Sequence, residues 1–209
     1  MSEDRKIVKQ VENAKLYSDG TISISNCRAS YPHVDKKWAK NPGKDTPRYS
    51  ITGILSMDTH AEAIALCREV AEQVRKEGKL KPNLKDELYF IRDGAAEKKP
   101  EYEGAWIVAS GETQRPAVLR RDKTRFDSPE EIADTILPGC RIDLLIEPWA
   151  QDNEHGQRVN ASLRGVRYLR MVEGEEIGEG GIDEETVASS FDDDGDGGFG
   201  DDDGDMGGL

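Results

Sequence analysis

The last nineteen residues of the chain cannot contribute to a folded core, and this limits the fold to the residues that precede them. The segment Phe191–Leu209 holds two copies of the block Asp-Asp-Asp-Gly-Asp, at Asp192–Asp196 and Asp201–Asp205, and otherwise mainly glycine. Such a sequence buries too little apolar surface to offset the entropy that ordering costs. We therefore expect a disordered acidic tail over residues 179–209.

The acidic residues are distributed unevenly along the chain. The chain has 42 Asp and Glu against 29 Lys and Arg, and 15 of the acidic residues but none of the basic ones follow residue 172. Residues 1–172 therefore hold 27 acidic and 29 basic residues, a net charge of +2. A slightly basic body is thus joined to an anionic tail, and blocks of like charge are often interaction segments.

Composition and short motifs exclude several classes of protein. The sequence has no run of about 18 apolar residues that could span a membrane, and its polar N-terminus does not resemble a signal peptide. The cysteines lie far apart, and neither they nor the histidines have the spacing of zinc ligands. We expect no cofactor, no metal and no membrane partner, and buried, reduced thiols at Cys27, Cys67 and Cys140.

Alternating apolar and polar residues predict about six strands in the body. In the strongest of them, the even-numbered residues from Cys140 to Ile146 form one apolar face. Gly53 and Gly165 are expected to mark bulges or bends within strands. The predicted strands are Thr21–Arg28, Tyr49–Met57, Glu87–Arg92, Gly104–Ser110, Cys140–Trp149 and Arg158–Arg170.

Two helices are predicted between these strands. The longer begins at Thr59–Glu62, which has the spacing of a capping box, and ends at Gly78. Apolar residues recur at helical spacing over residues 64–74, which indicates a face that packs on a sheet. The shorter helix begins at Pro129, with Ser128 as its N-cap.

Many short strands and few helices are typical of a β-barrel or sandwich, and long basic loops between strands are typical of an OB-fold that binds oligonucleotides. We predict a mainly β, OB-fold-like barrel over residues 18–178, with one main helix and one short helix. Residues 1–17 are expected to form a flexible arm.

Lysines and arginines concentrate in three predicted loops and on the outer face of the last predicted hairpin. A solvated loop explains each segment alone, but their joint occurrence favours a groove in which cations contact phosphates and rings stack on bases. Phe90 and Trp106 lie within predicted strands and are assigned to the core. The candidate DNA-binding residues are Tyr31, Lys36, Lys37, Trp38, Lys40, Lys44, Arg48, Arg92, Lys98, Lys99, Tyr102, Arg115, Arg120, Arg121, Lys123, Arg141, Trp149, Arg158 and Arg164.

Two other functions are consistent with the sequence. An acidic interaction protein or DNA mimic would have a patchy surface instead of a continuous basic groove. A nuclease would need converging carboxylates, and the spacing of Asp86, Glu87, Asp93 and Asp143 matches no metal site. Because phosphate-binding loops and hydrolase motifs are also missing from the sequence, we expect no enzymatic activity.

Four short motifs, in this order and spacing, resemble a family of phage-encoded single-stranded-DNA-binding proteins. They are Ser30–His33, Ile91–Gly94, Leu137–Cys140 and Leu163–Val166. The resemblance covers about residues 18–178 and the acidic tail. It implies an OB-fold that coats single strands during phage DNA replication and recombination, in the cytoplasm of the infected bacterial host.

The resemblance also implies a role for the tail. Related proteins use such tails to recruit replication proteins such as polymerase or helicase-primase, and the tail competes with DNA for the groove. Those tails typically end in Phe, whereas this chain ends in Leu209, so Phe199 is the other candidate anchor. The candidate partner-binding residues are Asp192, Asp193, Asp194, Asp196, Phe199, Asp201, Asp202, Asp203, Asp205 and Leu209.

Overall fold

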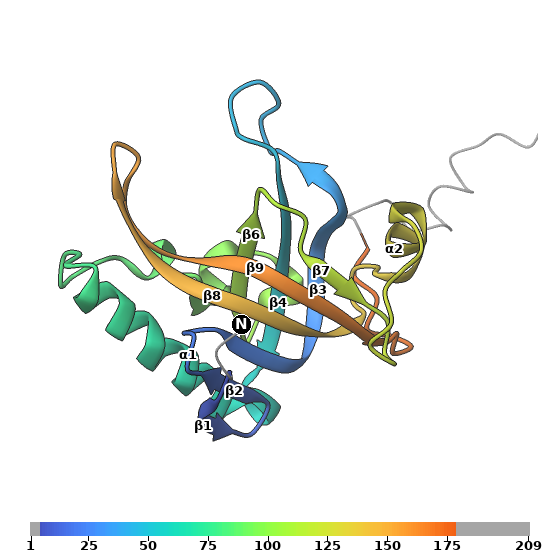
Figure 1. The fold of residues 1–209 in the computed structure, drawn as a ribbon, viewed down its shortest axis with the longest axis horizontal. Helices are drawn as coiled ribbons and strands as arrows, with labels where there is room; N and C mark the ends of the chain where they lie inside the picture. The colour runs from blue at the N-terminus through green and yellow to red at the C-terminus, as the bar shows by residue number, and fades with distance from the viewer. Residues whose placement is uncertain (1–4, 179–209) are drawn as a thin grey trace, which may run out of the picture. The chain divides into compact units, whose positions relative to one another are not determined.

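The structure, a computed structural model, describes residues 5–178. Within this range the chain forms nine strands in one sheet and two α-helices (Figure 1), which confirms the prediction of a mainly β protein with one long and one short helix. The strands are β1 Ile7–Val11, β2 Ala14–Tyr17, β3 Ile22–Trp38, β4 Arg48–Ser56, β5 Ile91–Asp93, β6 Ala105–Glu112, β7 Ala117–Leu119, β8 Arg141–Asn153 and β9 Gly156–Arg170. The helices are α1 Met57–Glu77 and α2 Pro129–Thr135, with short 3-10 helices at Asp86–Leu88, Gly94–Glu97 and Pro100–Tyr102.

The sheet closes on itself through a short segment at Phe90. Antiparallel pairing links β6, β4, β3, β8 and β9 in that order. The Phe90 N–H donates to the Val159 carbonyl of β9, and the Phe90 carbonyl accepts from the Ala109 N–H of β6, both at 2.8 Å. This segment joins the two ends of the row, so β3, β4, β6, β9 and β8 follow one another around a barrel of the OB-fold type (Figure 1).

The apolar face that the sequence predicts fills the barrel. Ile142, Leu144 and Ile146 of β8 are at most 1% exposed, and the three cysteines are buried free thiols. The bulge predicted at Gly165 is confirmed by a register shift of the β8–β9 pairing beside it. Gly53 instead provides close packing, because a Cβ there would lie 2.7 Å from Leu144 Cδ1.

Helix α1 forms where it is predicted but is capped differently. Ser56 is the N-cap, and its hydroxyl accepts from the Asp58 N–H at 3.3 Å. The expected capping box at Thr59–Glu62 does not form, because the Glu62 carboxylate accepts from the Glu12 N–H at 3.0 Å. The predicted apolar stripe is buried against the barrel core.

The flexible arm expected for residues 1–17 is, from Ile7 onward, a β-hairpin. Strand β2 pairs with β1 and extends the sheet at β3. Lys9 Nζ lies 2.6 Å from Glu69 Oε2 of α1, and the amide of Asn13 donates to the Thr59 carbonyl at 2.7 Å. Strand β1 was missed because most of it is exposed on both faces, which leaves no alternation to detect.

Strand β3 is longer than the sequence predicts. The predicted loop between Ser30 and Arg48 shrinks to residues 39–47, and the β3–β4 register shifts after Ser30. Tyr31 takes the left-handed conformation at this irregularity, with φ of 48°. Pro32 indicated a loop, but a proline is tolerated in a strand at such a bulge.

The second half of the chain follows the prediction with one addition. The Ser128 hydroxyl accepts from the Glu131 N–H at 3.2 Å and Pro129 opens α2, both as predicted. The addition is β7, a short strand that pairs in parallel with β9 inside the predicted basic loop. The predicted tail over residues 179–209, with its partner-binding residues, lies outside the described residues.

Candidate nucleic-acid interface

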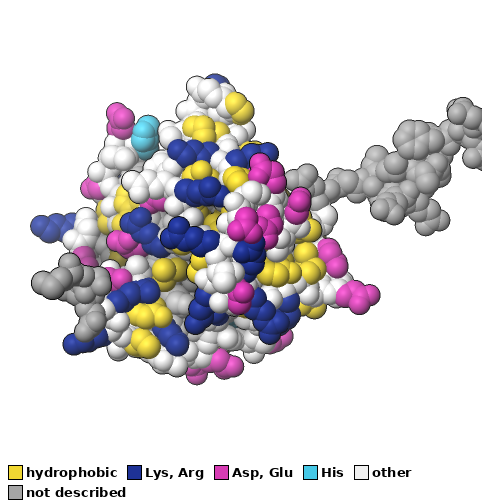
Figure 2. All heavy atoms as spheres, turned by 45° about the vertical axis from the view of Figure 1, so that its right-hand side comes forward, with side chains coloured by type: hydrophobic (Ala, Val, Ile, Leu, Met, Phe, Trp, Pro, Cys, Tyr) yellow, Lys and Arg dark blue, Asp and Glu magenta, His cyan; other side chains and the backbone are white. Residues whose placement is uncertain are grey.

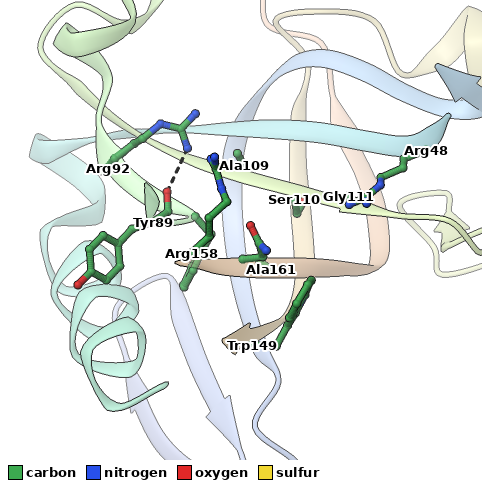
Figure 3. Close-up of a pocket in the computed structure, with 11 residues that line it drawn as sticks. Arg48, Tyr89, Arg92, Ala109, Ser110, Gly111, Trp149, Arg158 and Ala161 are labelled. Atoms are coloured by element: carbon green, nitrogen blue, oxygen red, sulfur yellow. Dashed lines mark hydrogen bonds between the residues drawn. The ribbon is translucent and has the colours of Figure 1, made fainter. Parts of the chain in front are cut away.

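A pocket lies at the seam of the barrel, where β6 and β9 face each other beyond the Phe90 bridge. It has a volume of about 210 Å³, and Ala109, Ser110 and Gly111 of β6 form one wall. Asn160 of β9 lies on the opposite wall. We call this hollow the seam pocket; its other lining residues are Arg48, Tyr89, Phe90, Arg92, Trp149, Arg158 and Ala161 (Figure 3).

The described residues that line the seam pocket include three arginines and no acidic residue. Arg48 approaches from the side opposite to Arg92 and Arg158 (Figure 3). Arg92 is held in place by Glu97, whose Oε1 lies 2.7 Å from Nη2, and it also donates to the Tyr89 carbonyl. Within residues 5–178, neither Arg48 nor Arg158 has a carboxylate at ion-pair distance, so both are available to phosphates.

Two exposed tryptophans flank these arginines. Trp149 is 39% exposed, borders the seam pocket and pairs across the β8–β9 hairpin with Asn160. Trp38 is 47% exposed and pairs across the β3–β4 hairpin with Arg48. The His33 ring stacks on Trp38, with centroids 4.6 Å apart and planes 6° apart, which fixes the orientation of the indole. Each ring is a candidate platform for a base.

The β3–β4 hairpin adds a group of exposed lysines to the same region. Lys36 and Lys37 lie near the end of β3, and Lys40 and Lys44 lie in the loop over residues 39–47. All four are exposed, as the sequence predicts for a basic loop. In Figure 2, Lys and Arg side chains gather across the middle of the face shown, with hydrophobic side chains between them. A flexible polyanion would find cations over a wide area of this face.

Tyr102 is misassigned as a stacking residue. Its side chain is only 2% exposed, and its hydroxyl lies 3.0 Å from the Ser30 hydroxyl. Burial raises the pKa of the Tyr102 phenol. The Lys99 ammonium lies 3.9 Å from the ring centroid of Tyr31, which is 45% exposed, and 5.2 Å from that of Tyr102. Tyr31 and Lys99 therefore remain candidates, together with the exposed Lys98.

Besides Arg92, three predicted DNA-binding arginines form ion pairs with carboxylates. Arg141 pairs with Glu175 and thereby lowers the pKa of that carboxyl. Arg164 lies 2.7 Å from Glu147. Arg120 pairs with Glu131 and Asp127 on either side of the start of α2. Of the three arginines predicted on the outer face of the β8–β9 hairpin, Arg141 and Arg164 therefore have acidic partners, because sequence alternation does not show which acidic residues come opposite.

The remaining predicted residues lie in the segment that leads to α2. Arg115, Arg121 and Lys123 are exposed, and within the described part of the chain none of them forms an ion pair. They do not line the seam pocket. Trp106, predicted to be in the core, is half-buried with Arg68 stacked 4.9 Å from its centroid, whereas Phe90 is buried as predicted.

The sequence did not single out several residues that line the seam pocket. Asn160 shares the polar face of β9 with Arg158, so the alternation that marked the arginine could also have marked the amide. Ser110 and Gly111 gave no signal, since small residues in a strand resemble ordinary core positions. They contribute because the two edges of the sheet meet there.

The alternative of a metal-dependent nuclease receives no support. Among residues 5–178, no group of three or more His, Cys, Asp or Glu side chains could hold a metal ion. In the same part of the chain, none of the helices combines the length and apolar character that crossing a bilayer requires.

The fold and the site together define the class of protein to which this chain belongs. An OB-type barrel with arginines and an exposed indole at its seam belongs with the oligonucleotide-binding barrels. Residues 20–199 match the family model described as the single-stranded-DNA-binding protein of Enterobacter phage Enc34, and the chain belongs to this family. That family is defined by DNA binding and not by a catalysed reaction, and it is the family that the four motifs indicated.

Solved structures of the phage Enc34 protein are similar to this chain. Its single-stranded-DNA-binding protein in complex with ssDNA is 38% identical, with a TM-score of 0.76 over 82% of this chain and 98% of that one. The same protein in another structure is 36% identical, with a TM-score of 0.76 over 89% and 99%. A C-terminal truncation of it is 38% identical, with a TM-score of 0.75 over 83% and 98%. A search of curated proteins gives no significant match.

Proposed function

We propose that the protein binds single-stranded DNA in the seam pocket and along the β3–β4 hairpin, without reading base sequence. The observation that carries this proposal is that Arg48 and Arg158, both without an acidic partner in the described chain, flank the exposed indole of Trp149. Cations on two sides hold successive phosphates, while a ring stacks on any base. The family relative solved with ssDNA supports the choice of ligand.

The wider role follows from family membership. The protein coats and protects single strands during phage DNA replication and recombination, and it acts in the cytoplasm of the infected bacterial host. Support comes from the match to a phage single-stranded-DNA-binding family.

The tail has two further proposed roles, which rest on its sequence alone. It recruits replication proteins such as polymerase or helicase-primase, with Phe199 and Leu209 as anchors among the aspartates. It also competes with DNA, because a tethered polyanion reaches an effective concentration on the order of millimolar near a basic body.

A fluorescence titration with labelled oligonucleotides tests the binding proposal. Single strands are compared with duplex at two salt concentrations, for the parent and for Arg48→Ala, Arg158→Ala and Trp149→Ala. Each arginine variant should make the log–log salt slope shallower by about 0.7, the value for one phosphate on a single strand. Trp149→Ala should weaken single-strand binding by about 1–3 kcal/mol.

The matched control is Lys76→Ala, which removes an exposed cation from the last turn of α1, outside the seam pocket. The control should bind like the parent. Seam variants that fold and bind single strands as tightly as the parent would refute the proposed site. Equal affinity for duplex and single strand would refute the proposed ligand.

A further inference from the structure

A second hollow lies between the start of α2 and the segment that follows β6. It has a volume of about 360 Å³, and its apolar walls come from both ends of the 116–132 region. We call it the α2 pocket; the side chains that matter here are Arg115, Val118, Arg125, Phe126, Asp127 and Ile132. Val118 and Ile132 are buried beneath it, while Phe126 is half-buried and forms part of the wall.

The Phe126 ring is held in place by an anchored arginine. The Arg120 guanidinium lies 5.1 Å from the Phe126 centroid. The same guanidinium donates to Glu131 at 2.6 and 2.8 Å and to Asp127 at 2.8 Å. Because α2 fixes Glu131, these bonds fix the cation and, through it, the ring. A fixed aromatic ring with a cation on one face is a suitable surface for stacking a base.

The charges that border the α2 pocket favour an anionic ligand. Arg115 and Arg125 are exposed, and in the described part of the chain neither forms an ion pair. The one carboxylate in the lining, that of Asp127, is already paired with Arg120. Two available cations therefore border a hollow with a ring in its wall, and the seam pocket likewise combines arginines with a ring.

The two pockets are close along the chain. Gly111 lines the seam pocket and Arg115 lines the α2 pocket. Four residues of extended chain span at most about 14 Å. At about 3.4 Å per nucleotide or more along a strand, roughly four nucleotides or fewer bridge that distance. Figure 2, which brings the α2 side of Figure 1 forward, shows Lys and Arg side chains across the middle of the face and Asp and Glu side chains in its right-hand part.

We propose that the α2 pocket is a second subsite for the same single strand, in which Phe126 stacks on a base and Arg115 and Arg125 contact phosphates. This inference rests on the proposed function and extends the binding path beyond the seam. The chosen ligand is single-stranded DNA and not an acidic peptide, because the pocket offers a ring together with the cations and continues the seam. The site then has two parts: short oligonucleotides occupy the seam, and longer ones occupy both.

Oligothymidylates of two lengths test this proposal. OB-folds cover about 4–16 nucleotides, so one probe has about 5 and the other about 16. The key variant is Arg115→Gln with Arg125→Gln, which changes only exposed side chains. For the long probe the double variant should make the salt slope shallower by about 1.4, the value for two phosphates. For the short probe its affinity and slope should equal those of the parent.

Two further variants complete the experiment. Phe126→Leu keeps an apolar side chain in the wall but removes the ring, and it should weaken binding of the long probe by about five-fold or more with no change for the short one. Arg48→Ala serves as the matched control, since it should weaken binding of both probes. If Arg48→Ala weakens binding of the long probe and the α2-pocket variants do not, this inference alone is overturned. If Arg48→Ala does not weaken binding of either probe, the result counts against the seam site.

An acidic peptide probe distinguishes the other class of ligand. A labelled peptide of aspartates around one phenylalanine is titrated against the parent and the double glutamine variant. Weaker peptide binding with unchanged binding of the long oligonucleotide would assign the α2 pocket to a protein ligand and overturn the proposal. If the double glutamine variant loses the same affinity for the short and the long oligonucleotide, the effect is a general electrostatic one, and the proposal is overturned as well.

Discussion

Arg164 of β9 forms an ion pair with Glu112 of β6 across the open part of the seam, with 3.4 Å between Nη1 and Oε2. The same guanidinium lies 2.7 Å from Glu147 of β8. Backbone hydrogen bonds at Phe90 close the seam at one place, and the Arg164–Glu112 ion pair closes it at another. Residues of β6 and β9 that line the seam pocket lie between these two places. The alternation of β9 places Arg158 and Arg164 on one basic face, but only Arg158 is without an acidic partner in the described chain.

This difference predicts unequal effects of two arginine substitutions. Arg158→Ala should weaken single-strand binding and make the salt slope shallower by about 0.7. Arg164→Ala should change the single-strand affinity and the salt slope much less, because Glu112 and Glu147 already neutralise that cation. Since Arg164 is 42% exposed, its loss should cost the fold less than about 1 kcal/mol. Paired titrations check this, and equal losses in affinity would contradict it.

Tyr102 should matter for folding and not for binding. Tyr102→Phe removes the hydroxyl that bonds Ser30 at 3.0 Å and keeps the buried ring. The free energy of unfolding should fall by about 1 kcal/mol, and DNA affinity should stay at the parent value. Denaturant unfolding and an oligonucleotide titration measure the two quantities. Weaker DNA binding with unchanged stability would restore Tyr102 to the binding surface.

The sequence predicted the barrel better than it predicted the site. Alternation located β8 and β9, because one face of each is buried and the period of two is therefore strict. Pro32 concealed the second half of β3, since the bulge that accommodates a proline depends on pairing with β4. For the same reason Trp38, assigned to a loop, ends a strand opposite Arg48.

For the site, the sequence identified the kinds of residue and not their neighbours. Trp149 and Arg158 were found because they lie on the polar faces of strands. Arg141 and Arg164 were included for the same reason. Their carboxylate partners are Glu175, Glu112 and Glu147, which all lie far from these arginines in the sequence. Long-range pairing of this kind decides which arginines are available to DNA, and no local pattern reports it.

His60 should make stability depend on pH near neutrality. Its imidazole is buried at the start of α1, with Nε2 3.0 Å from the Ser25 carbonyl and Nδ1 2.8 Å from the Thr59 hydroxyl. Burial lowers the pKa of His60 below its usual 6.5, Arg141 lowers it further, and Glu12 opposes the shift. Below pH 6.5 the unfolded chain binds this proton more readily than the folded one, so stability should fall as the pH drops from 6.5 toward the lower folded pKa.

Two measurements check the behaviour of His60. An NMR titration of the imidazole should give a pKa below 6.5 in the folded protein. Denaturant unfolding from pH 7.5 to 5.5 should show a loss of stability that His60→Gln reduces, because glutamine does not titrate. A folded-state pKa at or above 6.5 would contradict the burial argument, whatever the stability of the variant.

Removal of the tail should tighten single-strand binding. Residues 191–209 carry eight aspartates and no cation, on a body whose first 172 residues have a net charge of +2. A tethered polyanion at an effective concentration on the order of millimolar lowers the fraction of protein free to bind DNA. Truncation after residue 190 should therefore raise affinity by about three-fold or more at low salt, and the gain should shrink as salt screens the charges.

A chain with all eight of these aspartates changed to asparagine is the matched control, because it keeps the length of the tail and removes its charge. If charge is the cause, this chain and the truncated one should gain affinity equally. Should only the truncated chain bind more tightly, the length of the tail and not its charge would be responsible. Equal affinities of all three chains at low salt would exclude competition by the tail and leave recruitment as its remaining proposed role.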